Sequence, residues 1–166
     1  GPDSVVPFLV MERLVGQTLQ THIDRDIVPE SVVVSCAYQL ASALQAAHGV
    51  GLLHRDIKPE NNSVEPGGRV VLLDFGLTKS FSAAHERQTF VVEESRVVGT
   101  PTFLSPEQID SPNAVGPQAD LFALGATLYF AATQVLPFRG ETLVELLESI
   151  RHEPHLPLSA LVTASS

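Results

Sequence analysis

A long uncharged stretch constrains the fold more than any other feature of this sequence. Residues 121–138 contain no Asp, Glu, Lys or Arg, and the stretch just reaches the lower length limit for a membrane-spanning helix, about 17 residues. Gly125, Pro137 and some threonine and glutamine side chains interrupt its apolar character. A helix that is apolar on all sides is expected to be enclosed by protein. We therefore predict a buried helix of a soluble domain here, not a membrane span.

The composition is typical of one compact domain. The chain has 166 residues and a formal net charge of -9, and its hydrophobic content of 44% argues against disorder. Non-specific binding to nucleic acid is not expected, because phosphates require a basic face. The single cysteine, Cys36, excludes a disulfide framework and the usual kind of zinc cluster, and it favours a cytoplasmic protein. Neither a signal peptide nor an initiator Met opens the chain, so we expect a piece of a longer protein.

Apolar periodicity predicts helices in three parts of the chain. The first begins at Pro29, and apolar residues recur at helical spacing up to Gly49. A second resumes at about Ala119 and contains the uncharged stretch. A third starts at Thr142, where Thr142 and Glu145 form a capping-box pattern ahead of a leucine-rich face.

The remaining segments predict short strands and loops. Continuous apolar or β-branched runs predict strands over residues 5–11 and 70–73. In residues 78–118, apolar residues recur with neither the helical nor the strand period, which predicts a loop. Loops of such length are usually functional. The tail from Glu153 is expected to be irregular. The predicted fold class is therefore mainly α with a few short β-strands (α+β).

The first segment that carries chemistry is HRDIKPEN, residues 54–61. Phosphoryl transfer needs a carboxylate to accept the proton of the attacking hydroxyl, a cation beside the phosphoryl group and oxygen ligands for Mg²⁺. Asp56 can supply the carboxylate, Lys58 the cation and Asn61 a metal ligand. Pro59 stiffens the span between them. The simpler alternative is a solvated loop of mixed charges.

The second such segment is VVLLDFG, residues 70–76. A carboxylate just past a buried strand is well placed to hold a hard cation through oxygen, which makes Asp74 a second candidate metal ligand. Gly76 permits a sharp turn, and Phe75 can anchor that turn in the core. The alternative is an ordinary strand followed by a turn, where Asp and Gly are common.

Together, the two segments resemble the signature of eukaryotic-type (Hanks-type) Ser/Thr protein kinases, and the bacterial branch is the most similar. The resemblance runs over about residues 7–157. It implies a protein-kinase-like fold with residues 1–166 as a partial catalytic domain. Residues 1–16 would be the last strand of the small N-terminal lobe and the hinge. Residues 17–166 would be the large C-terminal lobe to about its G helix, with the rest of the N-lobe missing.

The resemblance implies a role for each residue that matches the signature. Asp56 would be the catalytic base, Lys58 would contact the γ-phosphate of ATP, and Asn61 and Asp74 would hold Mg²⁺. Thr100 would bond Asp56 and Lys58 and help to seat a Ser or Thr acceptor.

Residues 8–14 resemble the hinge segment that binds the adenine of ATP. Met11 would be the gatekeeper. The backbone carbonyl of Glu12 and the backbone amide of Leu14 would meet the adenine edge. The alternative is any strand that leaves a core.

The resemblance also implies contacts that support the site. His54 and Phe75 would stack in a hydrophobic spine between the lobes, and Asp120 would hold the backbone of the catalytic loop. Residues 99–107 resemble the end of the activation segment, with Ser105 where Ala is more usual.

Arg55 precedes the candidate base, and such an Arg usually pairs with a phosphate on the activation loop in this family. Glu93 and Glu94 stand where bacterial members often carry the phosphorylated Thr, and we hypothesise that they partly replace that phosphate. Solvated loop charges are the alternative. Thr89 and Ser95 are candidate phosphorylation sites.

The sequence also departs from the family pattern. It contains no Gly-rich phosphate loop, neither the strand lysine nor the helix glutamate of the N-lobe, and no arginine partner for Glu107. Asn62 and Ser63 are polar where the family usually has apolar strand residues. We therefore expect the chain to be inactive alone and its parent protein to be active.

The expected function is Ser/Thr protein kinase activity with ATP and Mg²⁺, on a protein substrate in the cytoplasm, or at the membrane if the parent has an anchor. A pseudokinase or scaffold is the alternative, and the intact Asp56, Lys58, Asn61 and Asp74 argue against it. A small-molecule kinase of the aminoglycoside type shares an H-x-D-x-x-x-x-N loop, but Lys58 and residues 99–107 favour a protein acceptor. The assignment requires Asp56, Asn61 and Asp74 to converge on one metal-sized site.

Overall fold

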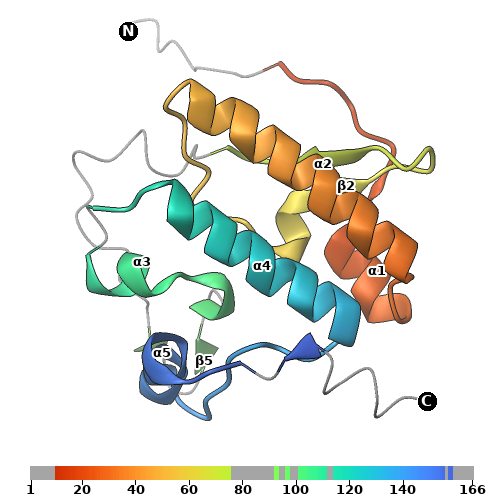
Figure 1. The fold of residues 1–166 in the computed structure, drawn as a ribbon. Coiled ribbons are helices and arrows are strands. Elements are labelled where there is room, and N and C mark those ends of the chain that lie inside the picture. The colour runs from red at the N-terminus through yellow and green to blue at the C-terminus, as the bar shows by residue number, and fades with distance from the viewer. Residues whose placement is uncertain are drawn as a thin grey trace, which may run out of the picture.

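The computed structural model describes residues 10–75, 92–93, 96–97, 101–111, 114–155 and 157–158. Helices make up most of the regular structure in these ranges, and the strands between them are short (Figure 1). The predicted class, mainly α with a few short strands, is confirmed.

Two long helices form the centre of the fold. α2 (Glu30–Gly49) and α4 (Pro117–Thr133) lie side by side (Figure 1). They match two of the predicted helices, and α4 contains most of the uncharged stretch. Within the described ranges, no helix has both the length and the apolarity needed to cross a membrane. The shared core contains buried aliphatic side chains from both helices, among them Leu40, Leu44, Ala123, Leu124 and Ala131.

Local chemistry explains where α4 begins and ends. Pro117 occupies the first turn, where a missing backbone N–H costs nothing. Gln134 ends the helix in the left-handed conformation, with φ 56°, and its backbone N–H donates to the carbonyl of Phe130 at 2.8 Å. Asp120 is buried in the first turn, although it is charged. This buried carboxylate is part of the candidate site described below.

A short helix that the sequence analysis missed precedes α2. α1 (Leu19–Arg25) begins after Thr18, whose side chain accepts a hydrogen bond from the backbone N–H of Thr21 at 3.2 Å. Leu19 and Ile23 are buried on one face of this helix. Its seven residues are too few for the periodicity of the sequence to stand out.

A three-stranded antiparallel sheet follows the order β1 (Gln17–Thr18), β2 (Asn62–Val64) and β3 (Val70–Leu72). β3 confirms the strand predicted over 70–73 to within one residue. The polar Asn62 and Ser63 do form a strand, and both are buried. Of the strand predicted over residues 5–11, residues 10 and 11 are not in a strand, and the others lie outside the described part.

The prediction of a long loop over residues 78–118 is wrong in part. β4 (Val92–Glu93) pairs antiparallel with β5 (Arg96–Val97), and α3 (Pro106–Asp110) follows. Ser105 and Gln108 form a capping box at the start of α3, which stabilises a helix too short to show a period.

The last helix, α5 (Leu143–His152), agrees with the prediction. Thr142 caps it, and the predicted capping box with Glu145 is present. A short 3₁₀ turn, η2 (Pro101–Phe103), packs against it. Ile150 of α5 is buried, and Glu153 ends the helix as expected.

Candidate functional site

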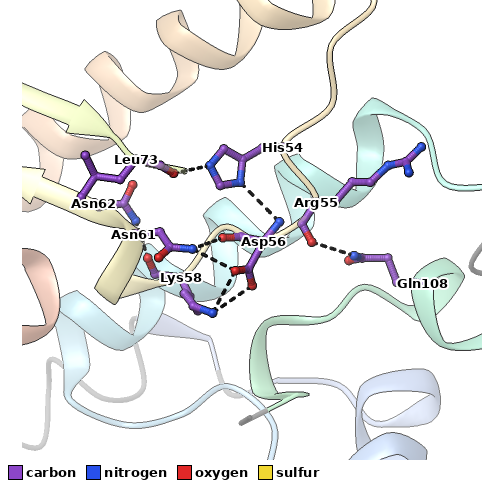
Figure 2. Close-up of polar contacts among 8 residues, drawn as sticks. All are labelled: His54, Arg55, Asp56, Lys58, Asn61, Asn62, Leu73 and Gln108. Atoms are coloured by element: carbon purple, nitrogen blue, oxygen red, sulfur yellow. Dashed lines mark hydrogen bonds and ion pairs between the residues drawn. The ribbon is translucent and has the colours of Figure 1, made fainter. Parts of the chain in front are cut away.

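The side chains of Asp56, Lys58 and Asn61 meet in one place (Figure 2). The Lys58 Nζ lies 2.9 Å from Oδ2 and 3.1 Å from Oδ1 of Asp56. The Asn61 Nδ2 donates to the Asp56 Oδ2 at 3.0 Å and to the Asp56 carbonyl at 2.8 Å. The loop therefore brings a carboxylate, an ammonium group and an amide together, and the Asp56 carboxylate is exposed to solvent.

A single 3₁₀ turn, η1 (Pro59–Asn61), sets this spacing. The backbone N–H of Asn61 donates to the Lys58 carbonyl at 2.9 Å. The same carbonyl accepts a bond of 2.7 Å from Nδ2 of the buried Asn62. Ile57, between Asp56 and Lys58, is only 2% exposed and anchors the loop in the hydrophobic core. The polar residue at position 62, where the resemblance implied an apolar strand residue, thus supports the loop.

A buried carboxylate on α4 holds the start of the loop. The Asp120 Oδ1 accepts from the backbone N–H of Arg55 at 2.7 Å, and its Oδ2 accepts from that of His54 at 2.9 Å. The expected contact between Asp120 and the loop backbone is therefore present. His48, near the end of α2, adds a third contact, with its Nε2 2.8 Å from Oδ2.

His48 and Gln108 are two supporting residues that the sequence reasoning missed. Gln108, from α3, donates through Nε2 to the Arg55 carbonyl at 3.1 Å (Figure 2). The only local signal for His48 is its helical spacing from the buried Leu44, which puts a polar ring on an apolar face. The partner of either side chain is distant in sequence, so no local pattern could have identified it.

Backbone strain occurs at Asp74 and at the residue that precedes Asp56. Arg55, just before Asp56, has φ 67°, and Asp74 has φ 56°. The left-handed conformation costs a non-glycine residue about 1–2 kcal/mol, and such strain persists only where the surroundings impose it. The bonds from Asp120 and Gln108 impose it at Arg55.

Asp74 is attached to the same loop through its neighbours. The Leu73 N–H donates to the Asn61 carbonyl at 2.8 Å, and the Leu73 carbonyl lies 2.7 Å from the Nε2 of His54. On the other side, the Phe75 ring contacts the His54 ring edge-on, with 4.8 Å between centroids. The expected stacking of His54 and Phe75 is thus present, and the backbone on both sides of Asp74 is fixed to the loop.

Asp74 and Asn61 each offer the kind of oxygen donor that Mg²⁺ binds. Mg²⁺ usually binds to one or two protein oxygens and completes its shell with water and substrate phosphates. Asp74 offers a carboxylate, and the Asn61 amide turns its nitrogen toward Asp56, which leaves its oxygen on the other side of the group. Within the described residues, no three His, Cys, Asp or Glu side chains form a preformed metal centre.

The expected hinge residues lie in residues 10–16, which have no helix or strand. Met11 is 65% exposed and Leu14 is half-buried. Glu12 forms a bidentate ion pair with Arg69, at 2.8 and 2.9 Å. This guanidinium lowers the pKa of the Glu12 carboxyl.

Several expected site residues have no described side chain. Glu93 lies in β4, where only the backbone is described. The other expected residues that lie outside the described part are Gly76, Thr89, Glu94, Ser95 and Thr100.

A sequence model described as "Protein kinase domain" matches residues 2–163. Serine/threonine-protein kinase PknL of Mycobacterium tuberculosis (strain H37Rv) is 39% identical over 147 residues, which are 88% of this chain and 35% of that protein. Serine/threonine-protein kinase AfsK of Streptomyces griseus is 38% identical over 158 residues, which are 93% of this chain and 19% of that protein.

Among solved structures, Rad53 1-466 in complex with AMP-PNP has a similar fold. The TM-score is 0.65 at 26% identity, and the match covers 85% of this chain and 33% of that one. The chain thus spans about a third or less of the length of these relatives.

Proposed function

This chain belongs to the protein kinase domain family, and from that membership we propose that it carries the catalytic loop of an ATP- and Mg²⁺-dependent Ser/Thr protein kinase. The convergence of Asp56, Lys58 and Asn61 within hydrogen-bond distance is the observation that supports this proposal best. The acceptor would be a Ser or Thr of a protein substrate, and the reaction would take place in the cytoplasm, where ATP is supplied.

In the proposed reaction, Asp56 is the base. Its exposed carboxylate accepts the proton of the Ser or Thr hydroxyl as the bond from that oxygen to the γ-phosphorus forms. The bond between the γ-phosphorus and the bridging oxygen breaks, and ADP leaves. Lys58 already lies beside Asp56, so its ammonium can move to the negative oxygens of the transferred group.

Asn61 and Asp74 are the proposed metal ligands. A bound Mg²⁺ would neutralise charge on the nucleotide phosphates. The chain contributes the placement of the two residues, because the bond between Leu73 N–H and the Asn61 carbonyl links the two segments that carry them.

Met11, Glu12 and Leu14 are the proposed adenine-binding residues, and Thr100 is proposed to orient Asp56, Lys58 and the acceptor. The family match over residues 2–163 includes all four.

The test is transfer of labelled phosphate from ATP to a generic basic protein by the full-length protein. Asp56→Asn keeps the shape of the side chain but removes the base, so we expect transfer to fall by a factor of about 100 or more. ATP binding should remain. Asp24→Asn, which alters an exposed carboxylate on α1, is the matched control and should leave transfer unchanged.

Two results would contradict the proposal. Full transfer by Asp56→Asn would exclude Asp56 as the base. Nucleotide binding without any transfer by the unaltered full-length protein would favour the pseudokinase or scaffold alternative.

A further inference from the structure

The segment proposed to bind adenine needs an external support. Residues 10–16 have no helix or strand, and Val10, Met11 and Val15 are 82%, 65% and 77% exposed. Fixing the backbone of each residue in one conformation costs conformational entropy. Specific contacts must therefore hold the Glu12 carbonyl and the Leu14 amide in a usable position.

Arg69 supplies the first of these contacts. Its Nη1 and Nη2 donate to Oε1 and Oε2 of Glu12 at 2.8 and 2.9 Å. This is the fork-to-fork geometry in which an arginine fixes the direction of a carboxylate as well as its distance. Arg69 lies in the turn between β2 and β3, far from Glu12 in sequence.

Glu65, at the other end of the same turn, supplies the second contact. Its Oε1 accepts from the backbone N–H of Val15 at 3.4 Å, and its Oε2 lies 3.3 Å from the Nη1 of Arg69. The Glu65 side chain is 17% exposed, compared with 61% for Glu12. Arg69 is thus held between two carboxylates: that of Glu12, which belongs to residues 10–16, and that of Glu65, which contacts the same segment through Val15.

The turn itself is attached to the core. Gln39 of α2 donates through Nε2 to the Gly68 carbonyl at 2.8 Å, and its Oε1 accepts from the Val70 N–H at 2.9 Å. The backbone N–H of Glu65 also donates to the Arg69 carbonyl at 2.9 Å. The turn is therefore fixed on α2 and can transmit that position to residues 10–16.

Close packing at Gly16 fixes the other end of the segment. A Cβ atom at Gly16 would come within 2.6 Å of the Val64 carbonyl oxygen, and Gln17 pairs with Val64 in the sheet. Residues 12 to 16 are therefore held at both ends by the β2–β3 hairpin.

We propose that Arg69 and Glu65 are positioning residues for nucleotide binding: through Glu12 and Val15 they hold residues 11–14 in the conformation that meets the adenine. This inference rests on the proposed function. It assigns a nucleotide-binding role to a hairpin turn that lies outside the catalytic loop.

Steady-state kinetics of the full-length protein with Arg69→Gln test the proposal. We expect the KM for ATP to rise about threefold to tenfold, as for loss of an exposed bidentate pair within a small network. The kcat and the KM for the protein substrate should not change, because Asp56 and Lys58 are held by other contacts. An unchanged KM for ATP, or a lower one, would overturn the proposal.

Arg151→Gln is the matched control. Arg151 also contacts two carboxylates at 2.8 Å, those of Asp110 and Glu148, but it lies on α5. The KM for ATP of Arg151→Gln should equal that of the unaltered protein.

Glu12→Gln should raise the KM for ATP as much as Arg69→Gln does, and the Glu12→Gln/Arg69→Gln double variant should have a KM no higher than that of either single variant. If the effects of the two single variants on the KM for ATP add in the double variant, Glu12 and Arg69 do not act through their ion pair.

Amide hydrogen exchange separates this inference from the proposed function, because it needs no nucleotide. Exchange of the backbone amides in residues 12–16 should accelerate in Arg69→Gln and remain unchanged in Arg151→Gln. Unchanged exchange in Arg69→Gln overturns the positioning role. If exchange accelerates but the unaltered protein binds no ATP, the proposed function fails, and the nucleotide role of the turn fails with it.

Discussion

Asp120 satisfies several donors with the two oxygens of one side chain. The backbone N–H groups of His54 and Arg55 and the ring of His48 all contact this carboxylate, which is 1% exposed. A buried donor that loses its acceptor costs the full free energy of its desolvation. The loop geometry therefore depends on the charge of Asp120 as well as on its shape.

The isosteric variant Asp120→Asn tests this dependence. An amide turns an N–H₂ group toward one of the donors, so we expect the free energy of unfolding to fall by about 2–4 kcal/mol. Urea unfolding of the full-length protein measures the change. Asp24→Asn, at an exposed position on α1, should alter the unfolding free energy by less than about 0.5 kcal/mol. Equal effects of the two variants would refute the role of Asp120.

Cys36 should be inert in the folded protein. It is fully buried on α2, and this burial raises the pKa of its thiol to about 11. The thiolate, which is the reactive form, is then scarce at about pH 8. Iodoacetamide labelling followed by mass spectrometry of the α2 peptide should find no modification until denaturant is added. Rapid labelling of the native protein would show that α2 is not packed as described.

At the scale of elements, the length of a helix decided whether the sequence could reveal it. α2 and α4 have 20 and 17 residues, and their apolar patterns predict them. α1 and α3 have seven and five residues, which is two turns or less. Caps and contacts with the core stabilise such helices, as Thr18 and the Ser105–Gln108 box do. Only the caps are visible in the sequence.

The capping box of α5 gives a prediction for a single element. The Thr142 Oγ1 accepts from the Glu145 N–H at 3.2 Å, and the Glu145 Oε2 accepts from the Thr142 N–H at 3.2 Å. Thr142→Ala removes one of these bonds and should destabilise the first turn of α5 by about 1 kcal/mol. Faster amide exchange at the start of α5 would show this loss. Thr142→Ser retains the hydroxyl and should keep the amides at the start of α5 protected from exchange. Equal exchange in the two variants would show that the hydroxyl does not stabilise the helix.

At the scale of the whole molecule, the sequence predicted which residues of the loop would lie together, but not the residues that support them. The order and spacing of residues 54–61 and 70–76 led to the prediction of phosphoryl transfer, because that reaction requires a base, a cation and oxygen ligands for Mg²⁺. The contacts of His48, Gln108 and Arg69 with the site or its hinge segment cross between distant segments. Such pairs are set by the packing of helices and strands, and a single sequence does not show which segments become neighbours.

The activation segment offers the last prediction, because Arg55 leaves a polar atom unsatisfied. Its Nε is buried and has no hydrogen-bond partner among the residues that the structure describes. The Arg55 side chain also points away from Asp56 (Figure 2), so it is not used to hold the base. An anionic group of the activation segment would satisfy it, and we expect Glu93 or Glu94 to contribute that charge in place of a phosphate.

The double variant Glu93→Gln/Glu94→Gln in unphosphorylated full-length protein tests this expectation. Loss of the carboxylates should lower kcat about threefold to tenfold, the range for a partly exposed charge network. In the Arg55→Gln background the same double change should have no further effect, because the partner is already absent. An unchanged kcat in the double variant would show that these glutamates are only solvated charges.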